Sequence, residues 1–164
     1  MPPSAALRLA LYQPDIAQNT GTILRLGACL GLPVEVIEPC GFPFATGHGK
    51  RALGRAALDY LAHADIHRHA DWEAFEAGRD PLSRLVLLST AGDTPYTAAR
   101  YRPGDVLLSG RESAGVPPGV HAAADIRVVI PMVKGLRCLN VALATAMVAG
   151  EALRQLRWSG QHER

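Results

Sequence analysis

Short runs rich in valine, isoleucine and leucine alternate along this chain with stretches of helical periodicity. The predicted strands are Leu7–Tyr12, Val34–Ile37, Leu85–Ser89, Val106–Ser109 and Ile126–Ile130, with a weaker one near Ile66. The predicted helices are Thr22–Leu30, opened by Asn19 or Thr20, then Ala52–Leu61, Asp71–Ala77 with Asp71 as its N-cap, Pro118–Ala123 and Leu139–Leu156. Because most of these strands are apolar on both faces, we expect an α/β fold in which helices cover both faces of a parallel sheet.

The composition is that of a folded protein, and we expect one domain over residues 1–164. Hydrophobic residues make up 48% of the chain and charged residues 20%, which excludes disorder for most of it. The longest apolar stretch without a charge, residues 138–150, is shorter than the roughly 18 to 20 residues of a membrane helix. Residues 1–15 also lack the layout of a signal peptide. We therefore expect a cytoplasmic protein with no membrane partner.

Cysteine and histidine spacing gives no indication of a metal site. The three cysteines, which form no C-x-x-C pair and are expected to be free thiols, are Cys29, Cys40 and Cys138. His63, His67 and His69 lie close together in the sequence but have no acidic or cysteine partner at ligand spacing. We expect these histidines to face solvent or RNA, and we predict no bound metal.

Residues 48–69 form a locally basic segment in a chain whose net charge is only +2. The basic residues and histidines of this segment are His48, Lys50, Arg51, Arg55, His63, His67, Arg68 and His69, against Asp59 and Asp65. Outside Lys50 and Lys134, every basic residue of the chain is arginine, whose planar guanidinium suits phosphate. The same bias also arises from GC-rich codon usage without any function. The G-x-G-x-x-A spacing of residues 47–52 lies too far after its strand for a dinucleotide site. We interpret this segment as a mobile basic loop that meets RNA phosphate, with a plain solvated loop as the alternative.

Four loops that follow predicted strands are rich in glycine or polar residues. They cover residues 13–21, 90–92, 110–115 and 131–137. In open parallel sheets, ligands bind outside the carboxyl ends of the strands, where such loops meet. The sequence therefore predicts a site at this edge of the sheet.

Three motifs at these loops resemble those of the SPOUT superfamily of RNA methyltransferases. They cover Asn19–Arg25, Leu107–Pro117, and Ile130–Met132 followed by Leu139–Ala142. The chain further resembles the minimal TrmL type of this superfamily at Ile37–Pro39, Gly41–Phe42 and Arg55–Tyr60. The resemblance implies S-adenosyl-L-methionine-dependent methylation of the ribose 2′-hydroxyl at the wobble nucleotide of tRNA, position 34, a cytidine or modified uridine. It also implies a carboxyl-terminal trefoil knot and a homodimer.

The resemblance assigns two groups of site residues. The residues expected to contact the methyl donor are Leu88, Gly110, Ile130, Cys138 and Leu139. The polar residues expected at the reaction are Asn19, Arg25, Glu112 and Asn140. Arginine is a poor proton acceptor, so we expect Arg25 to hold phosphate and stabilise the developing alkoxide. Asn19 and Asn140 could instead cap helices, and Leu88 and Ile130 could be ordinary strand core.

Two positions depart from the pattern of the related enzymes. Cys138 stands where serine is common, and Gly150 stands where the TrmL type tends to have an aromatic residue. Two alternatives stay open. One is 2′-O-methylation of ribosomal RNA. The other, which these departures favour, is an RNA-binding SPOUT protein without catalytic activity.

Overall fold

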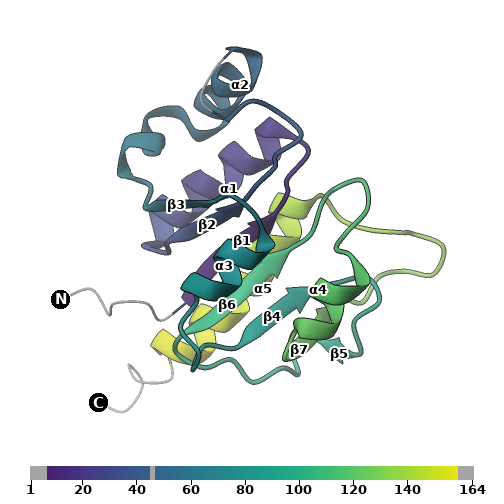
Figure 1. Ribbon diagram of the computed structural model, residues 1–164. Helices are drawn as coiled ribbons and strands as arrows, with labels where there is room; N and C mark the ends of the chain where they lie inside the picture. The colour runs from purple at the N-terminus through teal and green to yellow at the C-terminus, as the bar shows by residue number, and fades with distance from the viewer. Residues whose placement is uncertain (1–6, 45–46, 159–164) are drawn as a thin grey trace.

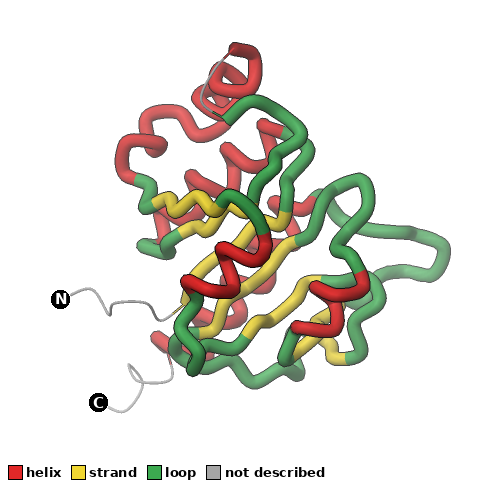
Figure 2. The backbone as a smooth tube through the Cα atoms, viewed as in Figure 1, coloured by secondary structure: helices red, strands yellow, loops and turns green. Residues whose placement is uncertain are grey.

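The computed structural model describes residues 7–44 and 47–158 and arranges this part of the chain around one seven-stranded sheet (Figures 1 and 2). The strands are β1 (Leu7–Tyr12), β2 (Val34–Ile37), β3 (Ile66–His69), β4 (Leu85–Leu88), β5 (Thr94–Pro95), β6 (Asp105–Ser109) and β7 (Ile126–Val129). Their order across the sheet is β3-β2-β1-β6-β4-β7-β5, and every pairing is parallel. The predicted parallel sheet is confirmed, whereas the trefoil knot stays a prediction.

Helices cover both faces of this sheet, as the apolar strands predict. They are α1 (Ala17–Leu30), α2 (Gly47–Ala57), α3 (Trp72–Gly78), α4 (Pro118–Ala123) and α5 (Val141–Leu153). A 3-10 turn, Leu58–His63, follows α2, and a π-helical turn, Arg154–Trp158, follows α5. In Figure 1, α3 and α4 lie on one face of the sheet, and α1 and α5 lie on the other.

The alternation of side chains along β1 shows why two layers are needed. The alternate residues Leu7, Leu9 and Leu11 pack in one core cluster with residues of α1, α2 and α5. Ala10 and Tyr12 pack in a second cluster with residues of α3 and α4. Successive side chains of a strand point to opposite faces, so a strand this apolar is stable only between two layers of helix.

Helix α1 begins earlier than the sequence indicates. It starts at Ala17 after an extended Ile16, which makes no side-chain cap, so the prediction that Asn19 or Thr20 opens the helix is wrong. Both residues lie in the first turn, where the Thr20 hydroxyl donates to the Ile16 carbonyl. The helix ends at Gly31, whose φ of 67° is the left-handed conformation of a C-cap. The predicted N-cap of α3 is confirmed, because the Asp71 carboxylate accepts from the Ala74 amide at 2.7 Å.

Three other boundaries differ from the predictions. Residues 47–52 form the first turn of α2, so their interpretation as a mobile loop is wrong. Helix α5 starts at Val141, because the side chain of Asn140 caps it. Strand β5, only two residues long, was not predicted, since so short a segment has no hydrophobic period.

Gly21 of the first motif lies where α1 and α2 touch. A Cβ atom on Gly21 would stand 2.7 Å from both the Ala56 Cβ and the Leu53 carbonyl oxygen. Real Cβ atoms do not approach other heavy atoms this closely, so the contact requires glycine. This glycine therefore serves the packing of α2, which carries much of the basic segment.

We predict that Gly21→Ala lowers the free energy of unfolding by about 1–3 kcal/mol, because the added methyl group must push α2 away. Gly54→Ala is the matched control, since it lies on α2 with nothing within 4 Å of the new Cβ. That control should be neutral or stabilising by up to about 1 kcal/mol. Urea unfolding measures both values, and equal effects would contradict the packing role of Gly21.

Candidate functional site

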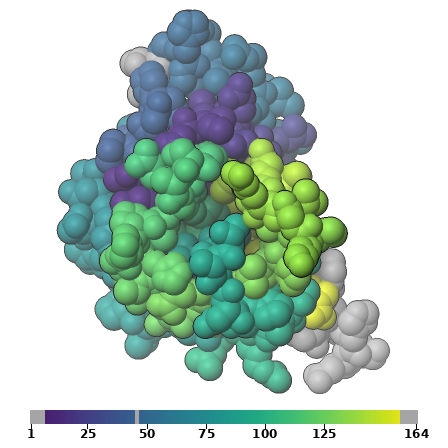
Figure 3. Space-filling model, turned by 90° about the vertical axis from the view of Figure 1, so that its right-hand side faces the viewer, coloured from purple at the N-terminus to yellow at the C-terminus, as the bar shows by residue number. Residues whose placement is uncertain are grey.

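A cavity of about 490 Å³ opens at the carboxyl ends of β4, β6 and β7. Its lining comes from residues 87–90, 109–116, 128–130 and 138–141, together with Ile16, Asn19, Met132, Ala144 and Val148. Figure 3 looks onto this edge and shows a hollow between the green segments around residues 110–125 and the yellow-green loop that precedes α5. The predicted convergence of loops at this edge is confirmed for those after β1, β4, β6 and β7, because Ile16 and Asn19 line the cavity as well.

All five residues expected to contact the donor line this cavity. Leu88 and Ile130 are half-buried at the ends of β4 and β7 and also pack against the core, so the strand-core interpretation describes part of their surface. Cys138 and Leu139 are exposed on the loop before α5. A Cβ on Gly110 would meet the Gly115 backbone at 2.7 Å, so glycine is required there by the loop itself.

Three of the four expected reaction residues form one chain of hydrogen bonds. The Asn140 Nδ2 donates to the Asn19 Oδ1 at 2.9 Å, and the Asn19 Nδ2 donates to the Glu112 Oε1 at 3.5 Å. The Asn140 Oδ1 also accepts from the amides of Ala142 and Leu143. Asn140 therefore caps α5 and at the same time orients Asn19, so both of its expected roles are compatible.

Arg25 lies apart from this group. It follows Asn19 by six residues on α1, which is about 9 Å along a helix and about 120° around it. Its guanidinium carbon lies 4.8 Å from the centre of the Tyr60 ring, a cation–π contact, and Arg25 is not part of the cavity lining. Within the described part of the chain no carboxylate pairs with Arg25, so its positive charge is available to an anion.

Asp15, to which no sequence pattern assigned a role, contacts the loop that carries Glu112. Its carboxylate accepts from the Arg111 guanidinium and from the Ser113 amide and hydroxyl. The hydrogen bonds from Ser113, together with Arg111, hold the pKa of Asp15 below its ordinary value despite partial burial. The only signal in the sequence was the polar loop after the first strand.

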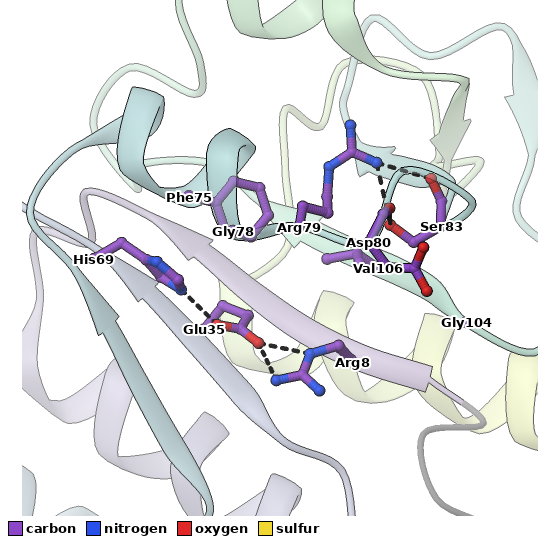
Figure 4. A pocket seen from close by; sticks show the side chains of 10 residues that line it. All are labelled: Arg8, Glu35, His69, Phe75, Gly78, Arg79, Asp80, Ser83, Gly104 and Val106. Carbon is purple, nitrogen blue, oxygen red and sulfur yellow. Dashed lines mark hydrogen bonds and ion pairs between the residues drawn. The ribbon is translucent and has the colours of Figure 1, made fainter.

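A second cavity, of about 280 Å³, lies on the sheet face that α3 covers (Figure 4). Its central carboxylate, Glu35, is buried and hydrogen-bonds the Arg8 Nε at 2.6 Å and the His69 Nε2 at 2.5 Å. The Arg79 guanidinium, on another wall, bonds Glu76 and Ser83. Since Glu35 is paired with Arg8 and His69, and Arg79 with Glu76, these side chains already have partners within the protein.

The remaining thiols and histidines form no metal cluster in the described residues. No group of three or more histidine, cysteine, aspartate or glutamate side chains is placed there to hold a metal ion. His67 pairs with Asp65 at 2.9 Å, and burial raises the pKa of the Cys40 thiol to about 11. None of the helices within residues 7–44 and 47–158 combines the length and hydropathy that crossing a bilayer requires.

Known proteins resemble this chain over nearly its whole length. The sequence model of the SpoU rRNA methylase family matches residues 6–150. A tRNA (cytidine(34)-2′-O)-methyltransferase of Beijerinckia indica is 56% identical over 149 residues, which cover 90% of this chain and 91% of the relative. A solved structure described as giving insights into the 2-OH methylation of C/U34 on tRNA has a TM-score of 0.86 and 40% identity, and covers 93% of this chain and 97% of its own.

A third likeness concerns a structure with a bound ligand. An AdoMet-bound rRNA methyltransferase from Sinorhizobium meliloti has a TM-score of 0.82 and 26% identity. The match covers 95% of this chain and 59% of that protein. These likenesses confirm the resemblance first seen in the three motifs.

Proposed function

Because the chain belongs to the SpoU rRNA methylase family, we propose that it is an S-adenosyl-L-methionine-dependent tRNA 2′-O-methyltransferase. Its target is the ribose 2′-hydroxyl of the wobble nucleotide, position 34, a cytidine or modified uridine. The observation that carries this proposal is the 56% identity to a tRNA (cytidine(34)-2′-O)-methyltransferase across 90% of the chain. The convergence of the expected site residues other than Arg25 on one cavity supports it.

The cavity at the carboxyl edge suits the methyl donor. Its volume of about 490 Å³ lies in the usual range of small-molecule pockets, roughly 300 to 1,000 Å³. Leu88, Ile130 and Leu139 offer aliphatic surface to a flat adenine, and the backbone at Gly110 and Cys138 offers hydrogen-bonding groups to its edge. When bound, S-adenosyl-L-methionine supplies a methyl group on a positively charged sulfur. That electrophile needs no metal, and we infer that the enzyme uses none.

We assign the polar residues to two functions, orienting the ribose hydroxyl and binding the RNA phosphate. Methyl transfer is an in-line displacement, so the ribose hydroxyl must be held in line with the methyl group. Asn19, Glu112 and Asn140 border the cavity as one hydrogen-bonded group and orient the hydroxyl there. Arg25, outside the cavity and free of carboxylates among the described residues, holds the neighbouring RNA phosphate and stabilises negative charge on the reacting oxygen.

An exposed apolar surface beside the cavity supports a homodimer. Leu143 and Met147 lie one turn apart on α5, with 59% and 39% of their surface exposed, and Leu139, in the loop before this helix, is 37% exposed. Ile16, which also lines the cavity, is 42% exposed. Large apolar side chains exposed in this way commonly mark a contact with another protein surface. We infer that a second copy of the chain covers it, and that the dimer works on tRNA in the cytoplasm.

Ribosomal RNA is the alternative substrate, favoured by the likeness to the rRNA methyltransferase of Sinorhizobium meliloti. An RNA-binding protein without activity is the other alternative, and it rests on Cys138 and Gly150. Nucleoside mass spectrometry of tRNA and rRNA from cells with and without the protein separates all three. Loss of 2′-O-methylation at position 34 of tRNA supports the proposal, whereas loss from rRNA only, or from neither, contradicts it.

The Arg25 assignment predicts a reaction defect without a binding defect for the donor. Arg25→Ala should slow single-turnover methylation of tRNA by roughly 10² or more, since it removes one charge-stabilising group. Arg25→Lys should recover little, because an ammonium lacks the planar fork of donors. Calorimetry should show nearly unchanged donor affinity for both variants. Near wild-type rates in both would mean that Arg25 is only a surface charge.

The dimer assignment predicts that charge on the apolar surface separates the subunits. Leu143→Glu should convert the dimer to a monomer at micromolar concentration, as measured by light scattering. Leu82→Glu is the control, because Leu82 is 91% exposed in the turn after α3 and away from this surface. That variant should stay dimeric. A wild-type protein that is monomeric at this concentration would refute the assignment.

A further inference from the structure

The loop that carries Glu112 forms its own backbone hydrogen bonds, but its position depends on contacts with residues outside the loop. Arg111 and Gly115 exchange two backbone hydrogen bonds of 2.9 Å, which close residues 111–115 into a tight turn. Gly115 has a φ of 62°, and Ser113 and Ala114 are exposed at the tip. These bonds fix the shape of the turn, but they do not fix its position over the cavity.

Asp15 supplies that anchor from the loop between β1 and α1. Its Oδ1 accepts from the Arg111 Nη2 at 3.1 Å and from the Arg111 Nε at 3.3 Å. Its Oδ2 accepts from the Ser113 hydroxyl at 2.5 Å and from the Ser113 amide at 3.1 Å. The backbone amide of Asp15 donates to the Glu112 Oε2 at 2.7 Å. One residue thus holds three consecutive residues of the turn, with Glu112 in the middle.

Asp15 is itself held firmly. The Gln13 amide donates to the Ile37 carbonyl at 2.8 Å, and the Gly41 amide donates to the Pro14 carbonyl at 2.8 Å. A Cβ on Gly41 would stand 2.9 Å from the Asp15 Cα, so the segment after β2 is in close contact with Asp15. The anchor therefore rests on the ends of two neighbouring strands.

We propose that Asp15 is a positioning residue for methyl transfer, which fixes the Glu112 carboxylate against Asn19 at the edge of the donor cavity. This inference rests on the proposed function, because it concerns the same site. Asp15 acts through Glu112 and the turn, since it is not part of the cavity lining. Its carboxylate also keeps the Arg111 guanidinium bound to the protein, so that this charge does not compete with Arg25 for RNA phosphate.

Asp15→Asn tests the proposal with little change in shape. Because the amide nitrogen cannot accept, either Arg111 or Ser113 loses its partner, while the backbone amide to Glu112 remains. We expect single-turnover methylation to slow by roughly tenfold to a hundredfold, the scale of a small misplacement at a reacting centre. The KM for tRNA and the melting temperature should change little. Either loss loosens the turn, so hydrogen exchange at the Ser113 amide should become faster.

The matched control is Asp105→Asn at the opposite edge of the sheet. Asp105 has the same kind of partners, namely the Nε and Nη2 of Arg84 and the backbone amide of Arg102, but it is 1% exposed and remote from the cavity. This variant should lower the melting temperature while leaving the methylation rate of the folded protein near that of the wild type.

Coupling to Glu112 decides between positioning and a general structural role. In a Glu112→Gln background, Asp15→Asn should add no further loss of rate, because the group that it positions is already gone. An equal loss in both backgrounds, a wild-type rate in the single variant, or a loss that follows the melting temperature would overturn the inference. A wild-type protein that methylates no RNA would instead refute the proposed function.

Discussion

The parallel pairing of β1 with β6 determines where the rest of this site can lie. Leu11 stands opposite Ser109, so the two strands end at the same edge and their following loops leave side by side. Asp15 and Glu112 meet there although 97 residues separate them. Strands β4 and β7 end at this edge as well, and they add Leu88 and Ile130. The register of the sheet therefore determines which loops surround the cavity, independently of the chemistry of their side chains.

Strand positions and the edge of the sheet that holds the cavity followed from local sequence, whereas the expected donor residues followed from the resemblance. A continuous apolar run identifies a strand that is buried on both faces. In a parallel sheet the residues that follow such runs meet at one edge, as Gly110 and Ile130 do. The start of α1 could not be found in this way, because Ile16 has no capping side chain. Asp15 was missed because its partners in the turn lie 96 to 98 residues away. Arg25 followed from the resemblance, but no local pattern indicated that it packs on Tyr60, outside the cavity.

Helix α5 connects the two sides of the site with few polar groups. Its first turn is capped by Asn140, which also bonds Asn19, and one turn later the Thr145 hydroxyl bonds Ser109 at 2.7 Å in the core. Thr145 and Ser109 are nearly inaccessible to solvent, and each satisfies the other. An almost wholly apolar helix is thereby fixed in rotation and in height against β6. The cavity depends on that placement, since Val141, Ala144 and Val148 of the same helix line it.

Gly21 shows that a residue of a shared motif need not take part in the reaction. Asn19 of the same motif borders the cavity and Arg25 lies on Tyr60, whereas Gly21 allows two helices to approach within the contact distance of their backbones. The glycine is constrained by helix packing, whereas the positions proposed for the reaction are constrained by catalysis. A descendant of this chain that kept the fold but lost both methyl transfer and RNA binding would be free to replace Arg25, yet it would still have to retain the glycine. The motif glycine by itself therefore indicates that a protein has this fold, but not that it has the activity.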